Sequence, residues 1–317
     1  MWLAHGVNYQ RMNVLITGGA GYVGTELLAK LALNKQINKI TIYDNLSKGH
    51  RSLFLGKKSC FLSKIVFVHG EILDSRLLKK QLTDTDILIH LAAMVTTPFA
   101  NTDPHFFEQV NHWGTAEVVY AAEESGVSKF IHLSSTAVYG TGADLADEST
   151  LPLPHTYYGI SKLRGETHVN RLMEKKNSII LRGGNIYGFS KSMRFDAVIN
   201  KFMFDAHFTN RIQIFGNGKQ TRAFIHVEHL VNTIEQCVLK EIPTGTYNLV
   251  DKNLQILEIL DALKELYPDL EFIYANQHMK LRELNVSLES KLFESITRFT
   301  STSLSDELQV FKSQFAF

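Results

Sequence analysis

The amino-acid sequence predicts an α/β protein with a Rossmann-like, doubly wound parallel sheet followed by a smaller, mixed α/β C-terminal lobe. Between residues 13 and 182, short apolar runs alternate with longer helical patterns. Such alternation is typical of right-handed βαβ units that build a parallel sheet. After Arg182 it gives way to segments containing glycine and aromatic residues. We therefore expect a second lobe over the carboxyl ends of the strands, where open α/β folds bind ligands.

The individual elements follow in chain order. The apolar runs predict strands at residues 13–17, 39–43, 64–69, 86–93, 129–135 and 178–182. The patterns between them predict helices near residues 22–34, 74–82, 106–125 and 156–176. We expect a first domain over residues 1–182, with 1–11 as an extension, and a second over 183–317, from which part of 213–250 packs back on the first. The polar run at 299–307 predicts a loop.

Composition narrows the class of protein. The chain has 317 residues, of which 44% are hydrophobic, enough for a sizeable core. Its 33 Lys and Arg balance 32 Asp and Glu, and a net charge of +1 provides no field to attract nucleic acid or an anionic membrane. Cys60 and Cys237 lie in apolar stretches, which predicts free thiols and no metal site. Without a signal-peptide or membrane-spanning pattern at the N-terminus, we expect a cytoplasmic protein.

The segment LITGGAGYVGTELL places Gly18, Gly21 and Gly24 between the first strand and the first helix. Glycines there allow a tight turn, and the helix N-terminus stabilises a pyrophosphate. Asp44 ends the second strand about 20 residues later, where a carboxylate accepts hydrogen bonds from a ribose. This carboxylate favours NAD, because it would repel the 2′-phosphate of NADP. Basic residues nearby, Lys48 and Arg51, leave NADP open.

A tyrosine and a lysine share one face of the helix predicted near 156–176. Tyr158 and Lys162 are four residues apart, whereas Tyr157 points elsewhere. An ammonium beside a phenol favours the phenolate and lowers the pKa of the tyrosine, which predicts an acid/base for a hydroxyl or carbonyl group. The preceding strand delivers hydroxyl side chains into a loop, where one of them can bind the same substrate oxygen: Ser134, Ser135 and Thr136.

Motifs in a fixed order extend these observations from about residue 13 to 250. They include TGGAGYVG, YDNLSKG, HLAA, VNHWGT, SSTAVYG, YYGISK, LRGGNIYG, GNGKQTRAFIHVEHL and TYNLV. In this order the sequence resembles the extended short-chain dehydrogenase/reductases, in particular the NAD-dependent nucleotide-sugar epimerases and dehydratases of the UDP-glucose 4-epimerase type. The resemblance implies a Rossmann domain that binds NAD and a lobe that binds a nucleotide-diphosphate sugar.

The resemblance also implies roles for individual residues. The catalytic set would be Ser135, Tyr158 and Lys162. The expected cofactor contacts are Gly18, Gly21, Tyr22, Val23, Gly24, Asp44, Asn45, Ser47, Glu71, Ile72, Leu91, Ala92, Ala93, Asn111, Tyr158 and Lys162. The expected substrate contacts are Thr96, Ser135, Thr136, Asn185, Asn200, Arg222 and Arg282. Arg222 would grip the diphosphate, although Ala223 and His229 replace two acids that the family usually has.

The reaction is narrowed by the residues after the catalytic hydroxyl. Relatives that dehydrate nucleotide sugars carry acidic residues there, whereas this chain has Thr136 and Ala137. Dehydration needs an additional acid/base, so the sequence favours a 4-epimerase. A 4-ketoreductase needs the same groups and remains open, with a 4,6-dehydratase or a non-catalytic dinucleotide-binding protein less favoured. The apolar faces of the helices near 106–125 and 156–176 could form the homodimer contact common in this family.

Overall fold

The structure is a computed structural model that describes residues 11–49, 51–55, 63–95, 103–142, 145–276 and 283–317. Its main feature is a seven-stranded sheet with the order β10-β6-β5-β4-β1-β2-β3. Every neighbouring pair in it is parallel. The predicted doubly wound parallel sheet is therefore confirmed.

The bounds of the elements in this half agree closely with the apolar pattern. The strands are β1 (Met12–Thr17), β2 (Ile37–Asp44), β3 (Ile65–His69), β4 (Ile87–His90), β5 (Lys129–Ser135), β6 (Asn177–Gly183) and β10 (Gly245–Leu249). The helices are α1 (Tyr22–Leu33), α2 (Ser75–Leu82), α3 (Pro104–Phe107), α4 (Gly114–Glu123), α5 (Tyr157–Met173) and α7 (Val227–Leu239). Two short 3₁₀ segments are η1 (Ser52–Phe54) and η4 (Thr136–Tyr139).

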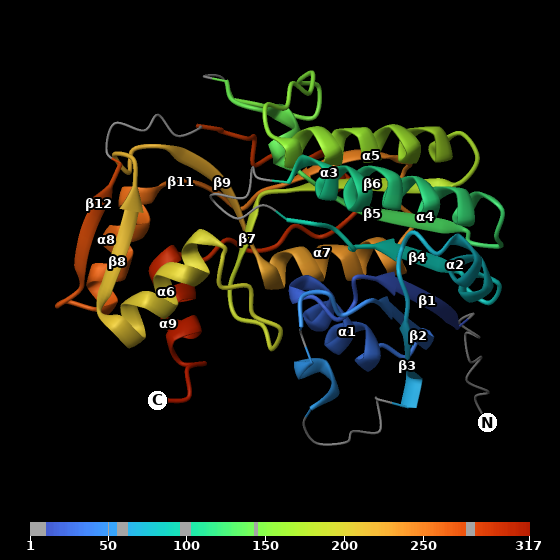
Figure 1. Cartoon of the computed structure of the whole chain (residues 1–317), viewed down its shortest axis with the longest axis horizontal. Coiled ribbons are helices and arrows are strands. Elements are labelled where there is room, and N and C mark those ends of the chain that lie inside the picture. Colours follow the sequence, from blue (N-terminus) through green and yellow to red (C-terminus); the bar gives the residue numbers. More distant parts are fainter. Residues whose placement is uncertain (1–10, 50, 56–62, 96–102, 143–144, 277–282) are drawn as a thin grey trace, which may run out of the picture.

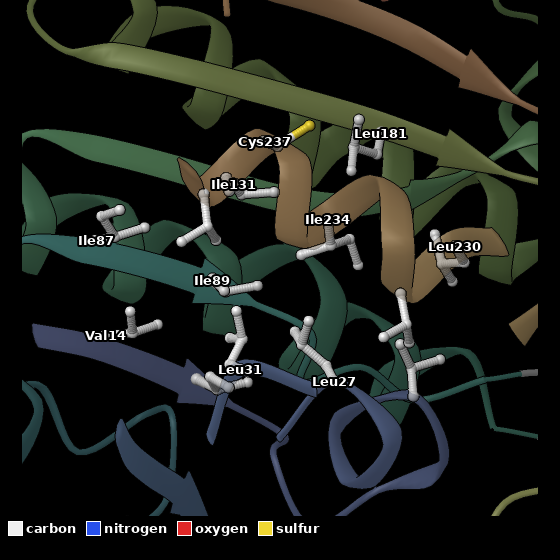
Figure 2. Close-up of a cluster of buried hydrophobic side chains, with 14 of the residues drawn as sticks. Val14, Leu27, Leu31, Ile87, Ile89, Ile131, Leu181, Leu230, Ile234 and Cys237 are labelled. Atoms are coloured by element: carbon white, nitrogen blue, oxygen red, sulfur yellow. The ribbon is translucent and has the colours of Figure 1, made fainter. Parts of the chain in front are cut away.

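Alternate side chains of the strands serve two separate hydrophobic layers. Val14 and Ile16 pack with α1 and α7, whereas Leu15 between them packs with α2, α4 and α5. Figure 1 shows α7 next to α1 and, higher in the view, α4 next to α5. In Figure 2, Leu27 of α1 and Ile234 of α7 lie on the same side of the strands. Because both faces are covered, these strands are apolar at successive positions rather than at every second one.

The helix predicted near 106–125 is not one regular α-helix. It consists of α3, a π-helical segment (Glu108–Trp113) and α4. Asn111 lies in the π segment, and its carbonyl approaches α5 at Gly165, where an added Cβ would lie 2.7 Å from that oxygen. The extra residue in the turn is a local adjustment of hydrogen bonding that an apolar pattern does not reveal.

The second lobe contains two small sheets. β7 (Asn185–Tyr187), β9 (Thr221–His226) and β11 (Lys252–Gln255) form one, and β8 (Arg211–Phe215) and β12 (Glu271–Ala275) form the other. Its helical segments are α6 (Val198–Thr209), α8 (Ile256–Leu266), η5 (Lys291–Glu294) and α9 (Leu304–Lys312). β10 and α7 come after the first strands of this lobe in sequence, but they belong to the large sheet and its cover: β10 pairs with β6, and α7 packs against α1.

Among the helices of the described residues, none combines the length and apolar content needed to span a membrane.

The prediction of a loop over 299–307 is wrong in its last part. Helix α9 begins at Leu304, and the hydroxyl of Ser303 accepts a hydrogen bond from the Asp306 N–H at 3.1 Å. Leu308 and Phe311 then bury their side chains in the second lobe. The polar residues of this run therefore cap a helix, since Ser at the N-cap satisfies a backbone donor that the helix leaves open.

Candidate active site

The carboxyl ends of β1 and β4 meet at the glycine turn. Gly18 has a φ of +71°, and an added Cβ would lie 2.6 Å from the backbone nitrogen of Ala92. Gly24 is equally close-packed, because its Cβ would lie 2.6 Å from the Cα of Gly19. Gly21 is the N-cap of α1 and provides no side-chain acceptor for the first turn. The turn thus keeps backbone N–H groups and a helix N-terminus near the end of the sheet, which fits the pyrophosphate of a dinucleotide.

Asp44 lies at the end of β2 beside this turn. Its carboxylate accepts hydrogen bonds from the N–H of Ala20 at 3.0 Å and of Leu46 at 2.8 Å. Each oxygen keeps a further lone pair, so the side chain can still accept a ribose hydroxyl. The next residue, Asn45, donates to the Glu71 carboxylate at 2.6 Å and accepts from the Ser47 N–H at 3.0 Å. These contacts join the loops after β2 and β3, which carry cofactor contacts that the family resemblance implies.

Other predicted cofactor residues contribute through the backbone or through packing. The hydroxyl of Tyr22 donates to the Gly188 carbonyl at 2.6 Å, so its side chain points to the second lobe. Ile72 is 5% exposed. Val23 is buried in α1, and the segment after β4 lies next to Gly18 with its side chains partly buried: Leu91, Ala92 and Ala93.

Asn111 links the segment after β4 to helix α5. Its side chain accepts from the Met94 N–H at 2.8 Å and donates to the Met94 carbonyl at 2.9 Å. It also donates to Ser161 Oγ at 3.0 Å. Because Ser161 precedes Lys162 on α5, these bonds tie the segment after β4 to the helix that carries the predicted acid/base. The polar atoms of the Asn111 side chain are used in this link.

Tyr158 and Ser135 come together at the carboxyl end of β5. Tyr158 lies in the first turn of α5, which Thr156 caps by accepting from the Gly159 N–H at 2.9 Å. The Ser135 side chain hydrogen-bonds to Tyr158. Its neighbour Ser134 points to the other face of the strand, where its hydroxyl donates to Glu166 at 2.5 Å. The alternation of the strand thus selects Ser135 from the three candidate hydroxyls, and Thr136 is only 3% exposed.

Lys162 lies one helical turn after Tyr158 but points into the sheet. Its ammonium donates to the Leu133 carbonyl at 2.6 Å, and the residue is 2% exposed. Burial lowers the pKa of Lys162 to about 8, against the effect of Glu166, which raises it.

The prediction that Lys162 lowers the pKa of Tyr158 is wrong for this structure. Burial raises the pKa of Tyr158, and the groups that oppose this rise are the Ser135 hydroxyl and the charge of Arg194. The reason is that the Lys162 ammonium is directed at a backbone carbonyl, while the partly buried Tyr158 packs its ring against Phe107.

Arg194 is a residue of this site that the sequence interpretation missed. It follows β7, and its Nε donates to the Asp196 carboxylate at 2.7 Å. Its carbonyl is held by the Asn200 side chain at 3.1 Å. The signal was present, since Arg194 lies in SMRFDAVINKF, the segment in which Asn200 was singled out. Only the fold shows that this segment returns to Tyr158.

The predicted substrate residues differ in their placement. Asn185 is exposed and donates to the Ala223 carbonyl at 2.9 Å. Burial lowers the pKa of Arg222, and among the residues that the structure describes no carboxylate pairs with its guanidinium. Asn200 does not face the site: it is fully buried and bonds to Gly188, Tyr22 and Arg194. Two further predicted contacts, Thr96 and Arg282, lie outside the described residues.

Comparisons with known proteins agree with this arrangement. A sequence model described as the NAD dependent epimerase/dehydratase family matches residues 14–249. The dTDP-D-glucose 4,6-dehydratase of Bos taurus is 31% identical over 260 residues, which span 80% of this chain and 71% of the relative. The UDP-glucose 4-epimerase of Mycolicibacterium smegmatis is 29% identical over 228 residues, which span 70% of this chain and 71% of the relative.

A solved structure shows the same fold. The UDP-glucuronic acid 4-epimerase from Bacillus cereus, in complex with UDP-glucuronic acid and NAD, has a TM-score of 0.84 and 24% sequence identity. The alignment covers 95% of this chain and 98% of that one. The likeness extends over both lobes.

Proposed function

The chain belongs to the NAD-dependent epimerase/dehydratase family of extended short-chain dehydrogenase/reductases, and we propose that it is a nucleotide-sugar 4-epimerase. The observation that carries the proposal is the surroundings of Tyr158. Ser135 and Arg194 act on its phenol, and among the described residues no carboxylate does. Thr136 and Ala137 stand where dehydratases carry acids. Within the described part of the chain the site thus has one acid/base, which is sufficient for oxidation and reduction at C4.

The proposed reaction needs proton transfer at one oxygen. When bound, NAD supplies the acceptor for the C4 hydride and returns that hydride. Tyr158 as the phenolate takes the proton of the C4 hydroxyl while the carbon becomes a ketone, and returns it after the sugar has rotated. Because burial raises the pKa of Tyr158, this step requires that the bound cofactor and sugar favour the phenolate. Ser135 donates a hydrogen bond to the same oxygen, and Lys162 holds the nicotinamide ribose. Because oxidation and reduction each move one proton and one hydride, the cofactor would end each turnover in its starting oxidation state.

The nucleotide diphosphate has a cationic site in the second lobe. A partly buried guanidinium that pairs with no carboxylate of the described residues favours an anionic ligand, which supports Arg222 as the phosphate-binding residue. Asn185, which is exposed on β7, would complete this contact. The Arg194 guanidinium, which is paired with Asp196, also acts on the Tyr158 phenol and would stabilise negative charge on the sugar oxygen during proton transfer.

The relatives also favour a second candidate, a 4,6-dehydratase. The dTDP-D-glucose 4,6-dehydratase of cattle is 31% identical to this chain. The two reactions differ in their products, since epimerisation conserves mass and dehydration removes a water molecule. A ketoreductase differs from both, because it consumes NADH or NADPH in every turnover.

One experiment separates the three activities. The purified protein is incubated with UDP-glucose, UDP-glucuronic acid or dTDP-glucose, and products are analysed by mass spectrometry and proton NMR. We expect an isomer of equal mass with the C4 configuration inverted, formed without added NADH. A product that has lost water would identify a dehydratase. Turnover only of a keto-sugar with added NADH or NADPH would identify a reductase.

We further propose a homodimer in the cytoplasm. The π segment, α4 and α5 expose aromatic side chains on one side of the molecule: Trp113, Tyr120 and Tyr157, which are 56%, 37% and 45% exposed. Apolar faces of this kind favour association between copies. Light scattering coupled to size-exclusion chromatography would give twice the chain mass, and a monomer at micromolar concentration would refute the dimer.

A further inference from the structure

Three strands bring polar side chains to one rung of the large sheet, behind Lys162. Ser134 of β5 is the register partner of Arg182 on β6, and Arg182 is the partner of Asn248 on β10. All three are buried. Polar groups in the middle of an apolar parallel sheet are costly unless each is hydrogen-bonded. Their arrangement is therefore a feature that needs a physical explanation.

Glu166 of α5 joins this rung. Its carboxylate accepts from Ser134 Oγ at 2.5 Å and from Arg182 Nε and Nη2 at 3.0 and 2.7 Å. The remaining guanidinium nitrogen donates to the Tyr139 hydroxyl at 3.0 Å, which donates to Asn248 Oδ1 at 2.8 Å. The Glu166–Arg182 pair is thus bidentate and nearly free of solvent contact, with side chains 1% and 8% exposed. A buried pair of this kind often adds no more stability than apolar residues of the same size.

The location of Glu166 points to a role beyond stability. It lies one helical turn after Lys162, and it is the negative group that acts on the Lys162 ammonium within the described chain. Two imidazoles, those of His90 and His132, also lie near this lysine. Burial, with the charge of Lys162, lowers the pKa of His90 to about 3 and that of His132 well below its usual value. Arg182 acts on Glu166 from the opposite side.

The same carboxylate also fixes the end of β5. Lys162 donates to the Leu133 carbonyl, and the next residue, Ser134, donates to Glu166. Ser135, which follows directly, carries the hydroxyl that bonds to Tyr158. Two consecutive residues of the strand are thereby bonded to two consecutive turns of α5. A shift of Glu166 would move both Lys162 and the strand end.

We propose that Glu166, fixed by Arg182, is a positioning residue of the active site, whose carboxylate balances the buried Lys162 ammonium and holds the strand end that carries Ser135. This inference rests on the proposed function, because it takes Ser135 and Lys162 as catalytic. It predicts that the charge at position 166, rather than the size of the side chain, sustains the reaction.

The test compares Glu166→Gln with the double variant Glu166→Gln/Arg182→Met. The single change leaves a buried guanidinium without its carboxylate and can unfold the chain, whereas the double change removes both charges. The Lys162 ammonium is titrated by NMR in protein with ¹³C-labelled lysine and no added cofactor or sugar, with Lys162→Met to assign the signal. We expect its midpoint to fall by about one pH unit in the double variant. Turnover should fall about tenfold above pH 8 and only about twofold at pH 7, with the alkaline limb of the pH–rate profile moved down by about one pH unit.

A matched control is Tyr139→Phe, which removes a hydrogen bond of Arg182 and leaves both charges in place. Its Lys162 midpoint should equal that of the wild type. The proposal is overturned if the double variant folds and keeps the wild-type midpoint, since a purely structural pair would lower only the stability. Because the NMR titration involves no nucleotide sugar, its outcome is independent of whether the protein proves to be an epimerase.

Discussion

The candidate site has two halves that are built differently. The cofactor half consists of the glycine turn and Asp44, and its shape comes from the backbone of one βαβ unit, where Gly18 adopts a φ of +71° against Ala92. The substrate half consists of Asn185, Arg194 and Arg222, charged or polar side chains from β7, the following loop and β9. The backbone of the cofactor half has no room for an added side-chain atom at Gly18. In the substrate half, substitution of a side chain can alter which ligand binds. We therefore expect changes in the two halves to have separable effects.

Tyr158 lies where the halves meet, and its substitution should have the largest effect. Tyr158→Phe removes the phenol that transfers the proton, and turnover should fall by about 10² to 10⁴-fold, the usual range for general acid–base groups. Affinity for NAD and for the sugar should change much less, because the glycine turn, Asp44 and the arginines of the second lobe are unaltered. The neighbouring Tyr157→Phe is the matched control, since Tyr157 is 45% exposed. Equal turnover in the two variants would contradict the assignment of Tyr158.

Gly18→Ala tests the rigidity of the cofactor half. The added Cβ would lie 2.6 Å from a backbone nitrogen at a positive φ, so we expect a loss of about 2 to 5 kcal/mol in the free energy of unfolding, from overpacking and left-handed strain together. Gly49 has nearly the same φ, +70°, and no atom within 4 Å of an added Cβ. Gly49→Ala should therefore cost only about 1 to 2 kcal/mol. Chemical denaturation of both variants, with calorimetric titration of NAD, tests this prediction. Equal losses of stability in Gly18→Ala and Gly49→Ala would contradict it.

The stability of the chain should depend on pH through Lys162, which is buried against β5. Its pKa falls from 10.5 to about 8 in the folded protein, so the unfolded chain binds more protons between these values. The contribution of Lys162 to stability therefore rises as pH increases from about 8 to 10.5, by up to about 3 kcal/mol. Subtracting the pH profile of Lys162→Met from that of the wild type isolates this term. Lys48→Met is the control for the loss of an exposed lysine. If the free energies of unfolding of the wild type and Lys162→Met differed by the same amount at every pH, the Lys162 ammonium would not be buried.

Arg194→Met tests the substrate half alone. Loss of the guanidinium should raise the KM for the nucleotide sugar or lower kcat by about tenfold, as expected for one charge-assisted contact. Affinity for NAD should stay unchanged. Lys191→Met, an exposed residue of the same loop, is the control for a general loss of positive charge. A parallel drop in NAD affinity would show that the halves are not separable.

Ser303→Ala should have the smallest effect and lies remote from both halves. The hydroxyl caps α9, so its loss should reduce the free energy of unfolding by about 1 kcal/mol without altering kinetics. Ser301→Ala, two residues earlier in the exposed segment, should be neutral. If the two variants are equally stable, the cap has no measurable role.

The sequence was sufficient for most of the first domain because its signals are local. Apolar runs locate β1 to β6 within a few residues, since the inner strands are covered on both faces. It was insufficient for the π segment around Asn111 and for the cap at Ser303, because both depend on individual hydrogen bonds. It also predicted a lower tyrosine pKa from helical spacing alone, whereas burial of Tyr158 raises it.

By itself, the sequence determined the parallel sheet, the dinucleotide turn, and the pairing of Tyr158 with Lys162 on one helix face. These follow from residue spacing and from the backbone freedom of glycine, which act over a few residues. Tertiary structure alone decided which hydroxyl meets Tyr158, which arginine approaches it, and which carboxylate lies behind Lys162. Ser135, Arg194 and Glu166 come from different segments, and their distances depend on how β5, the loop after β7 and α5 pack. Electrostatic effects depend on such distances and on burial, which residue spacing does not encode.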